Sequence, residues 1–229
     1  MIGAMCDVWR LAQERMVEVL RRPGNLILAV GVTALLSIFA APVGSDPIPI
    51  DLALSGRLFL LVTGIAGLFG YTFTGSRRPS AEIATDEIVS LRALVLGRIV
   101  SGALLACGMT WLAVLLMLAA TFVRHGTVPF PDPWVLGYAV FGPLVVAGAF
   151  AGAMTMARLL LRRSGRSVVA WILFLPWMLT FAAFRVLGGL PAAASLVVLL
   201  SLLSGFLLCG IEALVFLRFV PNRLTMRPG

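Results

Sequence analysis

The stretch Ile99–Val123, IVSGALLACGMTWLAVLLMLAATFV, decides the fold class of this chain. It runs for 25 residues without a charged side chain, and about 20 mostly apolar residues are enough for a helix to cross a bilayer. Backbone groups in lipid have no water to bond, so the segment must be helical. The rest of the chain agrees, because 60% of its 229 residues are hydrophobic and only 12% are charged. We therefore predict an all-α membrane protein.

Five other apolar stretches surround the first one, and together they predict six transmembrane helices within residues 25–229. These apolar stretches alternate with polar or proline-rich connections, as expected for a chain that crosses a membrane repeatedly. The predicted spans are Leu26–Pro42, Leu58–Thr74, Ile99–Val123, Trp134–Ala157, Val168–Ala183 and Ala192–Leu217.

The arginines divide unequally between the two sides of this arrangement. The chain has no lysine, and its net charge of +8 comes from 18 arginines against ten acidic residues. Fifteen arginines fall on one side, and only Arg57, Arg124 and Arg185 fall on the other. Basic residues gather in cytoplasmic loops, so both termini are expected in the cytoplasm, and the same rule accounts for the basic character without nucleic acid. The arginine-only, alanine-rich composition suggests a GC-rich bacterial genome, so we expect the chain in a bacterial inner membrane.

The N-terminal residues 1–24 form a separate cytoplasmic segment ahead of the first span. Within it, Met5–Arg22 places apolar residues on one side and charged residues on the other at helical spacing. This pattern predicts an amphipathic helix in the membrane interface, with Trp9 at headgroup depth and Arg10 toward the lipid phosphates. A plain cytoplasmic helix is the alternative.

Residues with catalytic chemistry are few. The only histidine, His125, stands beside Arg124 without a second histidine or cysteine nearby, and the three cysteines have no metal-binding or redox spacing. The chain also lacks a Ser–His pair, a zinc-protease motif and the lysine of a phosphate-binding loop. We therefore expect no catalytic activity and no cofactor or metal site in this chain.

Glu212 is the only acidic residue inside a predicted span. It precedes Arg218 by six residues, which is roughly 9 Å of helix rise from the cytoplasmic end. A carboxylate at this depth suits a translocation path or a gate, and the commoner alternative is a pair with a cytoplasmic arginine or a partner helix. A pattern of small residues in the fourth predicted span, Gly148–Gly152, allows close helix approach within the chain or between two copies.

The polar segment Ser76–Arg98, SRRPSAEIATDEIVSLRALVLGR, is the longest break between spans. Its Ser80–Arg92 part has an apolar stripe and an acidic face at helical spacing. We predict a short helix on the cytoplasmic membrane surface that presses its stripe into a partner and offers its carboxylates to basic residues there. The alternatives are packing on its own bundle or a solvated loop. The acidic residues are Glu82, Asp86 and Glu87, and the stripe is Ala84, Ile88 and Leu91.

With these features the chain resembles the integral-membrane subunits of the ABC-2 exporter family (type V exporters). Those subunits have an amphipathic N-terminal helix, six spans, cytoplasmic termini and a coupling helix between spans two and three. Leu96–Arg98 stands where the family has Leu-Gly-Lys, Glu82 falls on the family's glutamate and Ser90 on its serine. The sequence departs from the pattern at Pro79, where glycine is usual, at Ile88, where proline is usual, and in the arginine that replaces lysine. In length it is similar to compact members such as the CcmB-type subunit linked to haem export.

The resemblance implies a membrane-spanning permease subunit of an ATP-driven exporter. Two cytoplasmic ATP-binding subunits would bind ATP and magnesium, and a second copy or a homologous permease would complete the path. The alternative is a six-span secondary carrier or an assembly factor that uses no ATP. The residues expected to meet the ATPase, within the coupling segment 76–98, are Glu82, Asp86, Glu87, Ile88, Leu91 and Arg92.

Overall fold

The computed structural model describes residues 2–42, 50–74, 91–128, 130–160 and 193–220, together with four single positions between 175 and 182. Within these residues all regular structure is helical, and no strand occurs. The helices are α1 (Ile2–Leu20), α2 (Pro23–Ala40), α3 (Ile50–Phe73), α4 (Leu91–His125), α5 (Pro133–Leu160) and α7 (Ala193–Phe219).

Four of these helices are long and apolar enough to cross a membrane, namely α3, α4, α5 and α7. They overlap four of the predicted spans, and the count of six spans stays a prediction. The apolar part of α2, Leu26–Ala40, forms a shorter helix. The predicted span Val168–Ala183 lies outside the described residues except at four positions, which are helical. The class of all-α membrane protein is thus supported, with four candidate spans among the described helices.

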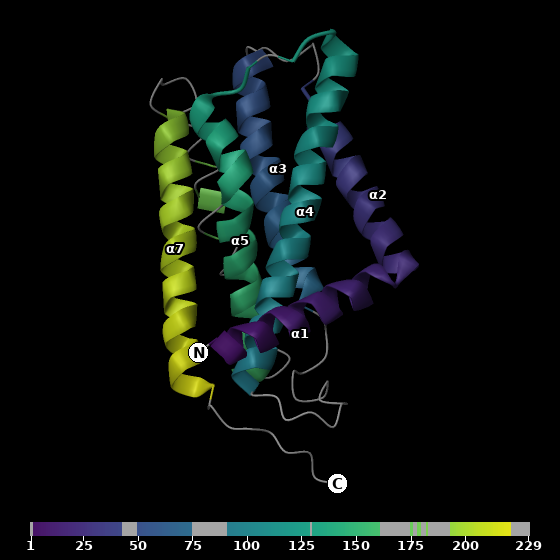
Figure 1. Ribbon diagram of the computed structural model, residues 1–229. Helices are drawn as coiled ribbons and strands as arrows, with labels where there is room; N and C mark the ends of the chain where they lie inside the picture. The colour runs from purple at the N-terminus through teal and green to yellow at the C-terminus, as the bar shows by residue number, and fades with distance from the viewer. Residues whose placement is uncertain are drawn as a thin grey trace.

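Five helices stand side by side, and α1 lies across one end of them (Figure 1). We call this end the base. α3 packs on α4 and α5, α7 packs on α5, and α2 packs mainly on α4. The predicted N-terminal amphipathic helix is therefore present, and it touches α4 where that helix begins. α4 has 35 residues, about 52 Å of rise, so it exceeds the roughly 30 Å of hydrocarbon in a bilayer.

Local sequence explains where α4 ends and α5 begins. Gly126 follows α4 with a φ of 71°, and its amide bonds the carbonyl of Phe122 at 2.7 Å. Glycine adopts this left-handed conformation without the penalty of a side chain. Asp132 then caps α5, because its carboxylate accepts from the amide of Trp134 at 2.8 Å. Pro133 takes the first helical position, where a missing amide costs nothing.

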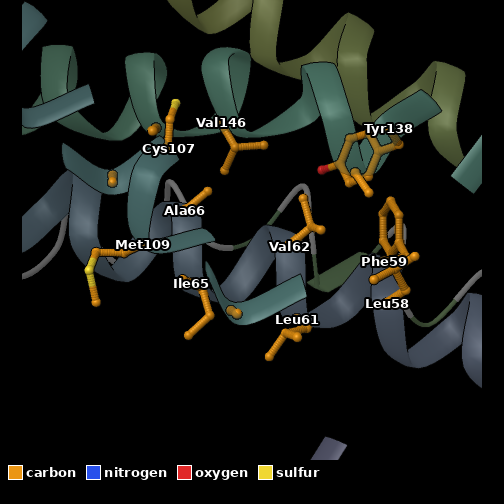
Figure 2. Packing of buried hydrophobic residues seen from close by; sticks show 14 of the residues in the cluster. Leu58, Phe59, Leu61, Val62, Ile65, Ala66, Cys107, Met109, Tyr138 and Val146 are labelled. Carbon is orange, nitrogen blue, oxygen red and sulfur yellow. The ribbon is translucent and has the colours of Figure 1, made fainter. Parts of the chain in front are cut away.

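The core lies between α3, α4 and α5 (Figure 2). The rings of Phe59 on α3 and Tyr138 on α5 stack with centroids 4.9 Å apart. In the same core, Val62 and Ala66 of α3 are fully buried, as is Val146 of α5. Small and branched side chains let these three helices approach closely, so α3 occupies the middle of the bundle.

α7 packs on α5 through a seam that repeats every three or four residues. Two such steps make seven residues, the period of side chains that interlock between nearly parallel helices. Ser201 and Gly205 in this seam are buried, whereas Leu203, Phe206 and Leu207 between the seam positions are exposed. The seam positions are Ala194, Val198, Ser201, Gly205, Leu208 and Glu212.

The inward face of α1 differs in part from the predicted apolar face. Ala12 is fully buried as expected. Leu11 and Arg15 are also partly buried, whereas Trp9 is half exposed. The cause is the crossing with α4, which selects the side of α1 that fits against a glycine rather than the side with most apolar area.

Candidate functional site

The segment predicted to meet a partner begins after α3 and ends at α4. Its acidic residues Glu82, Asp86 and Glu87 and its apolar Ile88 lie outside the described residues. The residues that flank 75–90 are described, namely Thr74 on one side and Leu91 and Arg92 on the other, and they contact other helices at the base. The candidate site is built from these two attachments.

The first attachment is Thr74, directly after α3. Its hydroxyl donates to the carbonyl of Tyr71 at 2.9 Å and accepts from Nη1 of Arg158 at 2.8 Å. Arg158 is 8% exposed and comes from the last turns of α5, and its Nη2 also reaches the Tyr71 carbonyl at 3.4 Å. Arg15 of α1 donates to the Thr74 carbonyl at 3.4 Å. The C-terminal end of α3 is therefore capped by cations from two other helices, which suits its negative dipole end.

The second attachment is Arg92, in the first turn of α4. Its Nε donates to the carbonyl of Val220 at 2.9 Å, and its Nη2 lies 3.5 Å from the carbonyl of Leu217. The guanidinium also stands 5.9 Å from the ring centroid of Phe216, within the range of a cation–π contact. Arg92 thus caps the C-terminal end of α7, while its neighbour Leu91 packs in a small apolar cluster with Val220.

Gly97 is the place where α1 crosses α4. A Cβ atom at this position would stand 2.9 Å from the Cβ of Leu11 and 3.3 Å from the carbonyl oxygen of Val8. Only glycine leaves room for this approach without a shift of one helix. The adjoining Arg98 is 2% exposed and so lies inside the base. The Leu96–Arg98 motif therefore sits at the crossing, two turns after α4 begins.

These contacts connect the two ends of residues 75–90 with three helices that are distant in sequence. We refer to Arg15, Arg92 and Arg158 as the basal arginines. Each of them donates to carbonyl or hydroxyl oxygens at the end of another helix, where backbone acceptors lack partners of their own. A force on residues 75–90 would therefore reach α1, α5 and α7 as well as α3 and α4.

Glu212 lies on the α7 seam and faces α5 at Gly152. A Cβ atom on Gly152 would overlap a carboxylate oxygen of Glu212, so the glycine makes the space that the carboxylate fills. The carboxylate also meets the backbone of Ala153, and its buried Oε1 has no hydrogen-bond partner among the described residues. Gly148, the other half of the small-residue pattern, has open space around it. The pattern thus serves packing within the chain at Gly152.

A chain of three hydroxyl groups crosses the middle of the bundle. The phenol of Tyr138 lies 3.0 Å from the hydroxyl of Thr63 on α3 and 2.9 Å from that of Ser201 on α7. All three side chains are buried. Thr63 also donates to the carbonyl of Phe59 at 2.9 Å, so the chain is anchored on the backbone of α3. It links three helices through neutral groups, which membrane interiors accept more readily than charges.

The opposite end of the bundle holds Arg57 and Arg124, two of the predicted outside cations, whereas Arg185 lies outside the described residues. Arg124 donates to the carbonyls of Ala41 at 2.7 Å and Ile38 at 3.0 Å, and Arg57 donates to the Ala41 carbonyl at 3.1 Å. His125 places Nε2 3.0 Å from the carbonyl oxygen of Pro42. These side chains cap the C-terminal end of α2. His125 therefore has a structural contact with the residue that follows the end of α2.

The remaining predicted residues sit on the surface of α1. Trp9 and Arg10 are both exposed there, and their role as interfacial anchors stays a prediction. Cys6 is exposed, whereas Cys107 is buried and Cys209 partly buried. In the described part of the chain no group of three His, Cys, Asp or Glu side chains could hold a metal ion.

Comparison of the chain with protein-family models, with curated proteins and with solved structures gave no match. Its function therefore has to be argued from its own residues.

Sequence reasoning missed several residues of the base and the interior. Arg15 and Arg158 counted only as charges that orient the chain. Tyr138 and its hydroxyl partners drew no attention, although a tyrosine in an apolar span, with serine or threonine in other spans, is a usable signal. Hydrogen bonds between membrane helices often involve such residues.

Proposed function

We propose that this chain is the membrane-spanning permease subunit of an ATP-driven exporter. In this proposal it sits in a bacterial inner membrane with the base and both termini toward the cytoplasm. It contributes half of a translocation path, and a second copy or a homologous subunit contributes the other half. ATP and magnesium bind to two separate cytoplasmic subunits, so this chain itself hydrolyses nothing.

One observation carries the proposal, namely the way both ends of residues 75–90 are held. Thr74 is bonded by Arg158 of α5 and by Arg15 of α1, and Arg92 is bonded to the end of α7. Cations also cap the end of α2 at the opposite end of the bundle, but at the base they join the flanks of one connection to α1, α5 and α7. A segment that receives force from a partner needs such contacts, because an unsupported loop would absorb the motion.

The mechanism follows from these attachments. Closure of the ATP-binding subunits would displace the acidic segment around Glu82 and Asp86. The displacement would act on Thr74 and Arg92 together and change how α7 and α5 lie against each other. Glu212 stands in the α5–α7 seam, so its environment would change with the motion, as expected for a gate or path residue.

A secondary carrier is the second candidate, and Glu212 is the observation that favours it. Carriers bind protons or ions on carboxylates near the middle of the membrane, and Oε1 of Glu212 is buried without a hydrogen-bond partner in the described part of the chain. A single carboxylate makes a short relay, however, and the nearest hydroxyl of the buried chain on α7, that of Ser201, lies about three turns from Glu212 along the helix. The hydrogen bonds of the basal arginines have no role in a secondary carrier.

Purification of the chain from its native membrane in mild detergent tests the proposal. We expect an ATP-binding protein with a phosphate-binding loop and an ABC signature to remain bound, and mass spectrometry would identify it. Transport by the purified chain from a proton gradient, with no ATP-binding protein present and lost in Glu212→Gln, would establish the carrier instead.

A further inference from the structure

A groove runs along the side of the bundle between α2 and α3. Its volume is about 350 Å³, and its walls are apolar side chains such as Leu36 of α2 and Leu61 and Ile65 of α3. Phe39 and Leu60 stand at its edge, and Phe39 is 74% exposed. The groove exists because α2 packs mainly on α4 and approaches α3 only slightly. In a membrane protein such a side faces lipid, which must fill the space between the helices.

The groove extends from one membrane surface toward the middle of the bilayer. Along α3 it runs from Arg57 to Ile65, eight residues or about 12 Å of helix rise. Half of a hydrocarbon layer measures about 15 Å. The groove therefore matches the depth of one leaflet, on the side opposite the base.

Cations stand at the mouth of the groove. Arg57 lines it directly, and Arg124 donates to the same carbonyl oxygen of Ala41 as Arg57 does. Two guanidinium groups are thus held near one another by the end of α2. Arginine presents a planar fork of donors that matches a phosphate group, and a positive potential attracts anionic headgroups. The arginines at the mouth of the groove suit a phosphate group, and the apolar walls suit a hydrocarbon chain.

We propose that the α2–α3 groove is a binding site for an anionic phospholipid of the leaflet at the Arg57 end. One acyl chain lies along Leu61 and Ile65, and the phosphate lies on Arg57. Gly64 leaves room for the acyl chain, because a Cβ atom on this residue would meet nothing within 4 Å. The inference rests on the groove and its cations, and it holds whether or not the chain works with an ATPase.

Two substitutions test the two halves of the site. Gly64→Leu places a side chain inside the groove, and its matched control is Gly108→Leu, a glycine of α4 that also has open space around it but lies away from the groove. Arg57→Gln removes the cation while Arg124 keeps the end of α2 capped. Its control is Arg218→Gln, which removes one exposed charge at the base.

The measurement is native mass spectrometry of the chain released from nanodiscs of phosphatidylcholine with a minority of phosphatidylglycerol. We expect wild type and both controls to retain phosphatidylglycerol. Gly64→Leu should lose bound lipid of both kinds. Arg57→Gln should bind phosphatidylglycerol about fivefold more weakly, the effect of one arginine near an anionic headgroup, and should keep phosphatidylcholine.

Three outcomes would overturn the proposal. Equal retention in Gly64→Leu and Gly108→Leu would place the lipid elsewhere, and equal losses in Arg57→Gln and Arg218→Gln would show unspecific attraction. A groove covered by a second copy of the chain would give a dimer without bound lipid, in which Gly64→Leu changes the oligomeric state. If Gly64→Leu fails to fold, the comparison of Arg57→Gln with Arg218→Gln still tests whether the lipid binds in the groove.

Discussion

At the scale of single residues, Glu212 and Gly152 form the most specific contact of the bundle. The carboxylate fills the space that the missing side chain leaves, and one of its oxygens is buried without a partner among the residues that the structure describes. A buried polar atom without a hydrogen bond costs about 1–3 kcal/mol. The proposed role of Glu212 as a gate or path residue would account for a group that costs stability in the α5–α7 seam.

The contact predicts a difference between two glycines on one helix. Gly152→Ala should lower the free energy of unfolding by about 1–3 kcal/mol relative to Gly148→Ala, because only the first substitution forces atoms into occupied space. Both substitutions gain the same helix propensity, so the comparison cancels that term. Thermal unfolding in detergent measures the difference.

The control is the same pair of substitutions in a Glu212→Ala background. There the two alanine variants should agree within about 0.5 kcal/mol, because the group that Gly152 accommodates is gone. An undiminished difference would place the cause of the destabilisation outside the carboxylate.

The sequence pointed to each of these residues but not to their contact. Glu212 stood out as the only acidic residue in a span, and Gly152 as half of a small-residue pattern. Spacing along one helix shows which residues share a face, but it does not show which other helix that face meets. The partner of α7 was therefore open, and Gly148 could not be told from Gly152.

At the scale of elements, α1 and α4 are held together by close backbone approach rather than by a large apolar face. Gly97 allows the crossing, and Ala12 of α1 is fully buried near it. The helical pattern of the N-terminus was readable from its spacing. The rotation of α1, which brings Leu11 and Arg15 inward, was not, because it depends on a glycine of α4 some 80 residues away in sequence.

The crossing predicts that Gly97→Ala loosens α1. Its new Cβ atom would stand 2.9 Å from the Leu11 side chain and 3.3 Å from the Val8 carbonyl, so one helix must shift. Amide hydrogen exchange across α1 should become faster, by tenfold for each roughly 1.4 kcal/mol of lost docking energy. Hydrogen-exchange mass spectrometry of the chain in nanodiscs provides the measurement.

Gly108→Ala is the matched control for this experiment. It changes the same residue type in the same helix, where a Cβ atom meets nothing within 4 Å. Exchange in α1 should then equal that of wild type. If both variants behave alike, the crossing at Gly97 does not hold α1 in place.

At the scale of the whole molecule, cations from one helix cap the ends of another. Arg124 and Arg57 reach α2, Arg158 and Arg15 reach the end of α3, and Arg92 reaches α7. In a membrane these carbonyl ends have little access to water, so a capping cation is worth more than on a soluble protein. These five arginines therefore have a structural use as helix caps at both ends of the bundle.

Hydrophobicity predicted the class of the fold and four of its long helices, because apolar length is a property of local sequence. The arginine caps could not be predicted from the sequence, because they join residues up to 128 positions apart. The acidic segment was found because it interrupts the apolar pattern, and its attachment through Thr74 and Arg92 became visible only in three dimensions.

The most direct test of the central claim reverses two charges in the predicted contact segment. Glu82→Arg with Asp86→Arg is compared with Asp7→Arg with Glu14→Arg, an equal change of charge at exposed positions of α1. The measurement is ATP hydrolysis by the copurifying ATP-binding subunit, in liposomes with and without the chain. We predict that the wild-type chain and the α1 variant both change the rate of ATP hydrolysis. The segment variant should insert normally but leave the rate unchanged. An unchanged effect of the segment variant would contradict the account.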